Sequence, residues 1–348
     1  MTESPEADIQ HRLAAYITAR SPQDGQARVE GLERIHGGAS RETYRFRLIR
    51  QTPQGETPPR RLILRRDPPG KTLVASQREV EFAAYRAVHG TAVPVPEMLW
   101  LEEDPSHLDQ PFFVAEEVAG FEVQGRLFSI APFKDVREQI GRAKWTILGE
   151  LARLDPKARK LVGPMPDVAP DQCWRRELDH WEAILDADEI APQPICRAAI
   201  RHMRRNPPPP ASRIALVHGD YRTGNFLFGA DGGVHAILDW EMAHLGDPLE
   251  DLAWSLSRTW CFGRNDLRGG LLPKAEAIAI WEQASGLKAD PDALTWWELF
   301  SVVKGQAIWA SSAKAWASGE TPELMLALTA WAMVNSHDRA ALELMGRL

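Results

Sequence analysis

Residues 216–251 of this chain read LVHGDYRTGNFLFGADGGVHAILDWEMAHLGDPLED, and they decide the fold. An apolar segment leads into the His-Gly-Asp triplet 218–220, and Asn225 follows after four intervening residues. The Gly-Ala-Asp-Gly-Gly segment at 229–233 is typical of a hairpin turn, because glycine and aspartate tolerate the positive φ that such turns require. A further apolar segment ends at Asp239. The stretch therefore predicts short strands that deliver acidic or amide groups at their ends.

Three of these groups match the requirements of phosphoryl transfer from ATP. Such transfer needs a carboxylate that accepts or orients the proton of the attacking hydroxyl, and oxygen ligands that hold Mg²⁺ against the phosphates. The spacing from Asp220 to Asn225 places a carboxylate and an amide on one tight loop, and Asp239 can return beside Asn225 across the hairpin. This is the layout of a protein-kinase catalytic loop and its metal-binding aspartate, with HGD for HRD and DW for DFG. We expect Asp220 to be base or orienter, and Asn225 and Asp239 to bind Mg²⁺.

Three motifs in order, HGD-x4-N, ILDWE and GDPLEDLA, closely resemble the aminoglycoside phosphotransferase family. The wording LDWE-x-A-x-LGDPL-x-DLA is most similar to the branch whose kinase domains occur alone or fused to acyl-CoA dehydrogenases. The resemblance implies an α+β fold of the protein-kinase type, with a small antiparallel-sheet lobe and a larger helical lobe. It also implies ATP and Mg²⁺ as cofactors.

Other residues of the stretch are expected to be structural. Asp247 precedes a proline and lies three residues before Glu250, which is typical of a helix N-cap. The family resemblance implies a scaffold role for Asp251. We expect His218 to brace the loop rather than to transfer protons.

The composition excludes several classes of function. The net charge of −7 and the lack of a dense basic patch argue against a nucleic-acid partner. Three cysteines without CxxC spacing argue against a disulfide scaffold or a zinc site. The polar N-terminal sequence is unlike a signal peptide, and no apolar run reaches membrane-spanning length. We expect a cytoplasmic protein without a membrane partner; the oligomeric state cannot be read.

A glycine-rich turn is predicted between strands at 29–35 and 44–49. Gly37 and Gly38 allow the backbone to approach phosphates and to present N–H groups. The family resemblance adds Ser40, whose hydroxyl can bond a phosphate oxygen. In isolation the segment could equally be an ordinary hairpin turn.

A cation and a carboxylate follow at the spacing of a kinase lysine–glutamate pair. Arg65 ends a predicted strand at 61–65, and Glu79 lies fourteen residues later on a predicted helix at 76–89. We expect Arg65, set by Glu79, to contact the phosphates, although the residue is arginine rather than lysine. The alternative is that Arg65 or its neighbour Arg66 points to solvent from an edge strand.

The segment 112–118 resembles the family's hinge. The Glu116 carbonyl and the Val118 amide are the candidates for binding the adenine edge, and Ala115 would be a small neighbour. This segment completes a five-stranded antiparallel lobe over 25–117. The domains are therefore predicted as 1–117, with an N-terminal helix at 8–19, and a helical lobe from 118 to 348.

Nine of the thirteen tryptophans lie from Trp240 onward, and most should pack between helices. Trp260 and Trp309 are candidates for an acceptor pocket. Acidic residues from 240 to 348 number 14 against 9 basic ones, which is not the acidic wall that a polycationic aminoglycoside would favour.

The predicted function is ATP- and Mg²⁺-dependent transfer of the γ-phosphoryl group to a hydroxyl of a small molecule. The family resemblance suggests a hydroxyacyl-CoA or a related hydroxy acid as the acceptor. Two alternatives remain open: an aminoglycoside or macrolide kinase, and a nucleotide-binding regulator with weak turnover.

Overall fold

The computed structural model describes residues 5–35, 42–68, 78–321 and 324–348. The chain forms two compact units. The first comprises residues up to 75 together with 96–119, and the second comprises 76–95 and everything from 120 onward. The sequence predicted a single boundary after residue 117, whereas the structure groups 76–95 with the helical unit.

The first unit is built on an antiparallel sheet in the order β1-β2-β4-β6-β5, with the short β3 paired to β2. Its strands are β1 (Gln26–Ile35), β2 (Glu42–Thr52), β3 (Gly55–Glu56), β4 (Arg60–Arg66), β5 (Met98–Glu102) and β6 (Phe112–Glu116). The five predicted strands are all present. β3 is a further strand of two residues that the sequence did not predict.

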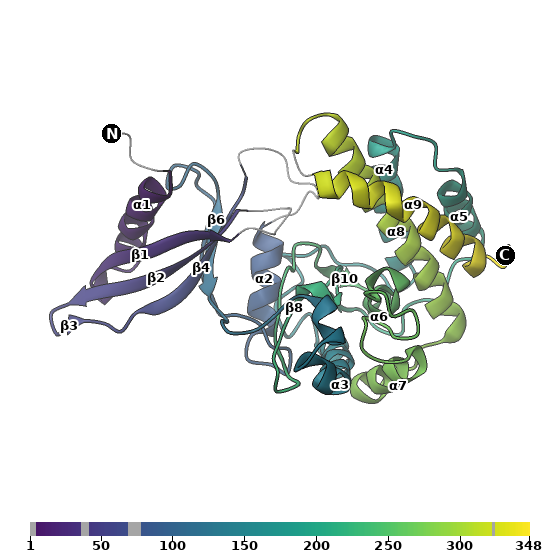
Figure 1. Ribbon diagram of the computed structural model, residues 1–348, viewed down its shortest axis with the longest axis horizontal. Coiled ribbons are helices and arrows are strands. Elements are labelled where there is room, and N and C mark those ends of the chain that lie inside the picture. The colour runs from purple at the N-terminus through teal and green to yellow at the C-terminus, as the bar shows by residue number, and fades with distance from the viewer. Residues whose placement is uncertain (1–4, 36–41, 69–77, 322–323) are drawn as a thin grey trace. The chain divides into compact units, whose positions relative to one another are not determined.

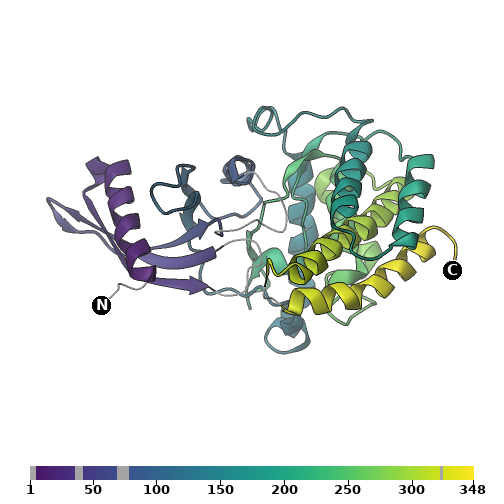
Figure 2. The same ribbon diagram turned by 90° about the horizontal axis from the view of Figure 1, so that it is seen from above.

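One helix, α1 (Pro5–Arg20), lies along a face of this sheet (Figures 1 and 2). Its buried side chains recur at helical spacing, which is why an otherwise polar segment folds against the strands. These side chains are Ile9, Leu13, Tyr16 and Ile17. They share a core with Leu62, Leu64, Phe112 and Val114 of the central strands.

The second unit is mainly helical. Its helices are α2 (Arg78–Val88), α3 (Phe133–Arg153), α4 (Cys173–Asp188), α5 (Pro194–Arg205), α6 (Pro248–Leu256), α7 (Lys274–Ser285), α8 (Pro291–Ala317) and α9 (Leu324–Leu344). α8 and α9 pack side by side as the yellow end of the chain (Figures 1 and 2). Short helical turns connect several of these elements. No helix in the described ranges combines the length and the apolar character needed to cross a bilayer.

Two small sheets carry the segment from 216 to 251. β7 (Ala215–Val217) pairs antiparallel with β10 (His244–Gly246), and β8 (Phe226–Phe228) pairs with β9 (Val234–Ile237). The predicted hairpin is therefore present. β10 was not predicted.

Most of the C-terminal tryptophans pack in the core, as the sequence predicted. The buried ones are Trp240, Trp254, Trp281, Trp296 and Trp297. Trp260 and Trp309 are half-buried. Trp331 on α9 is the most exposed of the nine.

Candidate active site

The loop that follows β7, residues 218–225, is here called the HGD loop. It brings the predicted residues together. The Asn225 side-chain amide donates to Asp220 Oδ2 at 2.8 Å and to the Asp220 carbonyl at 2.9 Å. The Leu238 N–H donates to the Asn225 carbonyl at 2.8 Å, which places Asp239 next along the chain. The carboxylate and the amide therefore share one loop, and Asp239 follows the residue whose backbone bonds to Asn225; these three residues are here called the HGD constellation.

Two further donors hold the Asp220 carboxylate. Trp254 Nε1 on α6 donates to Asp220 Oδ1 at 2.7 Å. Arg222 Nε donates to Asp220 Oδ2 at 2.9 Å, and its guanidinium lies 5.1 Å from the centre of the Trp260 ring. Both carboxylate oxygens thus have partners, and the rotamer of Asp220 is fixed.

His218 braces this loop in its neutral form. The Asp220 N–H donates to His218 Nδ1 at 3.1 Å, so that nitrogen must be unprotonated and Nε2 carries the hydrogen. Nε2 then donates to the Leu238 carbonyl at 2.9 Å. Complete burial lowers the pKa of His218 to about 4. The neutral imidazole, hydrogen-bonded at both nitrogens, therefore links the HGD loop to the segment at Leu238 and does not transfer protons.

Asp251 on α6 holds the backbone of the same loop. Its carboxylate accepts from the His218 N–H at 2.6 Å and from the Gly219 N–H at 3.0 Å. Burial raises its pKa to about 7. Gly219 has φ +83°, and a Cβ there would lie 2.4 Å from the Met242 carbonyl oxygen, so only glycine fits. These contacts agree with the scaffold role implied for Asp251.

Asp247 is the N-cap of α6, as predicted. Its Oδ1 accepts from the Leu249 N–H at 2.9 Å, and Pro248 occupies the first helical position. Its other oxygen accepts from Trp297 Nε1 at 3.1 Å. Burial raises the pKa of Asp247 to about 6.

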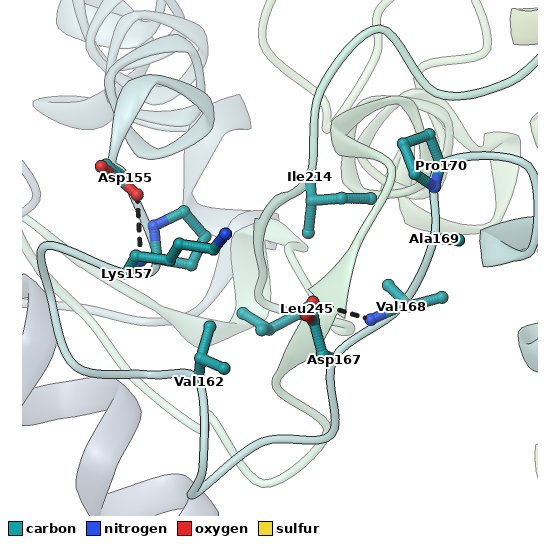
Figure 3. Close-up of a pocket in the computed structure, with 10 residues that line it drawn as sticks. Asp155, Lys157, Val162, Asp167, Val168, Ala169, Pro170, Ile214 and Leu245 are labelled. Atoms are coloured by element: carbon teal, nitrogen blue, oxygen red, sulfur yellow. Dashed lines mark hydrogen bonds between the residues drawn. The ribbon is translucent and has the colours of Figure 1, made fainter.

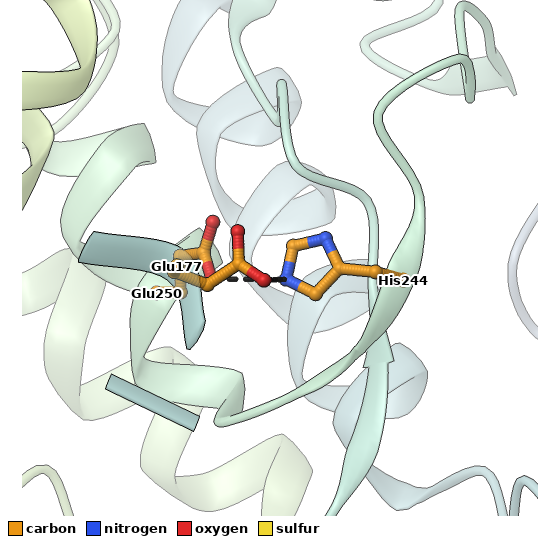
Figure 4. A group of neighbouring side chains, drawn as sticks. All are labelled: Glu177, His244 and Glu250. Carbon is orange, nitrogen blue, oxygen red and sulfur yellow. Dashed lines mark hydrogen bonds and ion pairs between the residues drawn. The ribbon is translucent and has the colours of Figure 1, made fainter. Parts of the chain in front are cut away.

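A buried charge network lies behind the HGD loop. Lys304 on α8 donates from Nζ to the Gly219 carbonyl at 2.6 Å and to Glu250 at 3.1 Å. His244 Nε2 lies 3.1 Å from Glu250 and 3.5 Å from Glu177 (Figure 4). The two carboxylates raise the pKa of His244 above its ordinary value despite burial.

The group Glu177, His244 and Glu250 is compact enough to suggest a metal site, since its ligand atoms lie within 4.8 Å of one another. Its charges argue otherwise. Lys304 already pairs with Glu250, and Arg176 Nε donates to Glu177 at 3.1 Å. A divalent ion would have to displace these cations or sit beside them. The cluster is therefore an internal ion network.

The residues Asn225 and Asp239 do fit Mg²⁺. The Asn225 amide nitrogen is taken by Asp220, while within the described ranges no donor bonds its Oδ1. Asp239 has φ +66°, an unfavourable conformation for a residue with a side chain, and its N–H donates to the Tyr85 hydroxyl at 2.9 Å. An amide oxygen and a carboxylate on adjoining loops are the hard ligands that Mg²⁺ prefers.

Lys144 on α3 lies under the HGD loop. It is fully buried, with Nζ 3.2 Å from Thr223 Oγ1 and 5.3 Å from the centre of the Phe226 ring. Burial lowers its pKa to about 7. Thr223 in turn donates to the Gly269 carbonyl at 3.2 Å. Lys144 thus supports the middle of the loop without touching Asp220.

In the first unit, Arg65 and Arg66 lie on opposite faces of β4. Arg66 pairs with Glu42 at 2.6 Å and donates to the Leu108 carbonyl at 3.0 Å, on the face that α1 covers. The Arg65 guanidinium lies 5.7 Å from the centre of the Phe113 ring, on the other face. β4 is an interior strand and not an edge. The phosphate contact of Arg65 stays a prediction.

The other nucleotide-binding candidates remain predictions as well. Glu116 ends β6, and its N–H donates to the Glu97 carbonyl at 2.9 Å. The N–H of Val118, just beyond the strand, bonds to no acceptor among the residues that the structure covers. Gly37, Gly38 and Ser40 lie outside the described residues.

The helix α2 carries two carboxylates that differ in environment. Glu79, the residue predicted to position Arg65, is exposed. Glu81, half a turn further along, is completely buried. A buried carboxylate is kept only where it has partners, so packing holds Glu81 in place, while the role of Glu79 towards Arg65 stays a prediction.

The structure also shows a hollow of about 660 Å³ in the second unit (Figure 3). Apolar side chains of Val162, Val168, Ile214 and Leu245 line it together with polar ones such as Asp167. Ile214 precedes β7, whereas the HGD loop follows β7. The hollow therefore lies at the other end of that strand from Asp220.

Sequence reasoning missed Trp254 and Lys304. Trp254 lies seven residues after Asp247 in the same predicted helix, but periodicity alone did not connect it with Asp220. Lys304 carried a usable signal: it is the single charged residue between Glu298 and Lys314 in an apolar helix. An isolated charge in such a run is either buried with a partner or functional.

The sheet unit and the HGD constellation define a kinase-like phosphotransferase fold. The chain belongs to the phosphotransferase enzyme family, whose model matches residues 31–311. Acyl-CoA dehydrogenase family member 10 of Mus musculus is 32% identical over 223 residues, which make up 63% of this chain and 19% of that protein. The chain therefore spans about a fifth of the mouse protein's length.

Solved structures agree on the fold. A Ralstonia eutropha protein assigned to the aminoglycoside phosphotransferases has a TM-score of 0.73 at 22% identity, covering 96% of this chain and 98% of that one. The aminoglycoside phosphotransferase APH(4)-Ia, in a ternary complex with AMP-PNP and hygromycin B, has a TM-score of 0.60 at 16% identity, covering 94% and 98%. The α+β, protein-kinase-like fold predicted from the sequence is confirmed.

Proposed function

We propose that this protein transfers the γ-phosphoryl group of ATP to a hydroxyl of a small molecule, with Mg²⁺ as the metal. The observation that carries the proposal is the hydrogen-bonded set of Asp220, Asn225 and the adjoining Asp239. Family membership supports a phosphotransferase, and the similar fold of a protein that binds AMP-PNP supports ATP as the donor.

Asp220 acts on the proton of the attacking hydroxyl. Its side chain is only 16% exposed, and three donors fix its orientation. A fixed carboxylate can align a hydroxyl for in-line attack without reorganising at the moment of reaction. Proton transfer to such a group contributes roughly 10²–10⁴ in rate.

Asn225 and Asp239 would hold the metal through Oδ1 and a carboxylate oxygen. Bound Mg²⁺ neutralises charge on the phosphates and aligns them. The hydrogen bond from Asn225 to Asp220 ties the metal ligand to the base, so both groups keep one geometry.

Arg222 adds a cation beside the base. In the structure it pairs with Asp220 Oδ2, and its side chain is 31% exposed. Some of its guanidinium N–H groups can therefore donate to a phosphate oxygen when substrate is present. Stacking on Trp260 keeps the guanidinium in place during that change.

For the acceptor we propose a hydroxyacyl-CoA or a related hydroxy acid. The similarity to a protein named for acyl-CoA dehydrogenase supports this choice. Phosphorylating such a hydroxyl converts it into a good leaving group. An antibiotic acceptor is the second candidate, favoured by the fold shared with a protein that binds hygromycin B.

A panel of acceptors tests the proposal. Mg²⁺ and ATP are supplied with hydroxyacyl-CoA thioesters, free hydroxy acids, hygromycin B, kanamycin and a macrolide, and ADP release is followed. The proposal expects acceptor-dependent ADP release with a hydroxyacyl compound. Brisk phosphorylation of the antibiotics alone would select the second candidate. Nucleotide binding without turnover on any acceptor would select a regulator.

A further inference from the structure

A wholly buried lysine lies behind the HGD loop and is not accounted for by fold stability alone. Lys304 on α8 is 1% exposed and pairs with Glu250, which is equally buried. Removing two charges from water costs several kcal/mol for each ion. Apolar residues of similar size in their place often stabilise a core at least equally. The pair therefore needs a reason besides stability, and the other contacts of Lys304 supply one.

The first contact is with the backbone next to Asp220. Lys304 Nζ donates to the Gly219 carbonyl at 2.6 Å, while Asp251 accepts from the N–H groups of His218 and Gly219. The peptide groups on both sides of Gly219 are thus bonded from two helices. Because glycine has no side chain, Gly219 can adopt its positive φ, but its backbone is also free to adopt other conformations. These hydrogen bonds restrict that freedom.

The second contact reaches the Asp220 side chain. Lys304 Nζ lies 5.1 Å from the centre of the Trp254 ring and 5.3 Å from the centre of the Trp181 ring. The same Trp254 donates from Nε1 to Asp220 Oδ1 at 2.7 Å. A cation on the face of an indole draws its electron density and strengthens the N–H as a donor.

We propose that Lys304 is a positioning residue for Asp220. It holds the backbone carbonyl that precedes the carboxylate and, through Trp254, one of its oxygens. Glu250 supplies the charge that keeps the ammonium buried. The inference rests on the proposed phosphotransferase function, because a positioned base matters only if Asp220 acts on a hydroxyl.

The test removes both members of the buried pair, so that the net buried charge does not change and His244 keeps Glu177 as its partner. K304M/E250Q is compared with K314M/D188N, which removes a partly exposed pair between Lys314, on the same helix as Lys304, and Asp188 at the end of α4. A second variant, W254F, keeps a ring beside Lys304 but removes the N–H that reaches Asp220. Kinetic constants, melting temperature and the indole N–H NMR resonance of Trp254, assigned by its loss in W254F, are measured for each.

We expect K304M/E250Q and W254F to lose roughly 10- to 100-fold in kcat, as displaced reacting groups do, with KM for ATP changed less than about threefold. The Trp254 resonance should move in K304M/E250Q and stay in K314M/D188N. A normal kcat with a lowered melting temperature would overturn the proposal, since Lys304 would then serve stability alone. An unmoved Trp254 resonance would also overturn it. If wild-type protein transfers phosphate to no acceptor, the proposed function fails, and the NMR comparison still decides whether Lys304 sets the Asp220 contact.

Discussion

Asp220 is held from three sides, by a tryptophan, an arginine and an asparagine that also faces the proposed metal position. The three residues that bond to Asp220 lie on different elements. Trp254 lies on α6, whereas Arg222 and Asn225 lie on the HGD loop itself. The carboxylate therefore depends on the packing of the loop against α6. The geometry around this one side chain therefore sets the proposed chemistry.

Substitutions of the two aspartates should fail in different ways. D220N keeps the shape but removes the proton acceptor, so kcat should fall by roughly 10²–10⁴ while affinity for ATP changes little. D239N removes a charged metal ligand, so it should raise the Mg²⁺ concentration needed for half-maximal activity. Steady-state kinetics across a Mg²⁺ titration separates the two. Near-normal turnover by D220N would refute the role assigned to Asp220.

The buried His218 makes stability depend on pH. The unfolded chain protonates histidine near pH 6.5, whereas burial holds the folded pKa at about 4. Between these values the unfolded state binds the extra proton, so the free energy of unfolding falls as the pH drops. The loss from this group between pH 7.5 and pH 5 is about 2 kcal/mol.

H218Q tests this effect, because a glutamine amide can accept from the Asp220 N–H and donate to the Leu238 carbonyl without titrating. Urea unfolding at the two pH values should show a smaller drop for H218Q than for the wild type. Other titrating groups are common to both proteins and cancel. Parallel pH profiles would mean that His218 does not contribute the predicted proton linkage.

At the scale of single residues, sequence predicted the metal and base candidates because they are close in the chain. Asp220 and Asn225 share one loop, and a single hairpin returns Asp239 to them. Trp254 and Lys304 could not be found this way. Their contacts with the HGD loop depend on how α6 and α8 pack, and helical periodicity shows that a face is buried but not what it meets.

At the element scale, two glutamates on α2 that are two residues apart have different environments. Residues two apart on a helix point in different directions, so Glu79 and Glu81 cannot serve the same partner. The spacing from Arg65 selected Glu79, yet that side chain is exposed and Glu81 is buried.

The pair offers a matched test of the role predicted for Glu79. We expect R65A to raise KM for ATP by about tenfold or more, and E79Q to do so more mildly, because an arginine loses the group that orients it. E81Q should lower the melting temperature instead, because it changes a carboxylate that is buried with its partners. Calorimetry of nucleotide binding and thermal unfolding are measured for each variant. An E79Q protein with unchanged nucleotide affinity beside a damaging R65A would refute the predicted pairing.

The cap of α6 is the second test at this scale. D247A removes the bond to Leu249 N–H and leaves the Trp297 N–H buried without an acceptor, which should cost about 2–4 kcal/mol of unfolding free energy. D247N keeps an oxygen in the cap and should cost less. Burial already raises the pKa of Asp247, so the charge itself is not what stabilises the helix. Equal losses in D247A and D247N would contradict this reading.

Element boundaries were predicted where apolar periodicity is strong. α3 begins at Phe133, but its first two turns carry no buried residues, so the apolar pattern becomes clear only from Ile140 onward. β10 is three residues long, which is too short for any period to appear. Its pairing with β7 comes from the fold of the whole unit.

At the scale of the whole molecule, family membership fixes the fold while leaving the acceptor to experiment. The chain's net charge is −7, yet the acidic residues are mixed with basic ones in the C-terminal half. We expect polycationic aminoglycosides to be poor acceptors, with kcat/KM at least roughly 10²-fold below that of a hydroxyacyl-CoA. Competition between kanamycin and a hydroxyacyl-CoA in one assay measures this ratio. A ratio in favour of kanamycin would contradict the acceptor proposed here.

Following the phosphoryl group itself tests the roles proposed for Asp220 and Mg²⁺. Wild-type protein and D220N are incubated with γ-³²P-labelled ATP, Mg²⁺ and a hydroxyacyl-CoA, and the label is traced to product. We predict label on the acceptor hydroxyl with the wild type, its loss when Mg²⁺ is chelated, and an initial rate of labelling lower by roughly 10²–10⁴ with D220N. Label transfer that is equally fast with D220N, or that needs no metal, would contradict these roles.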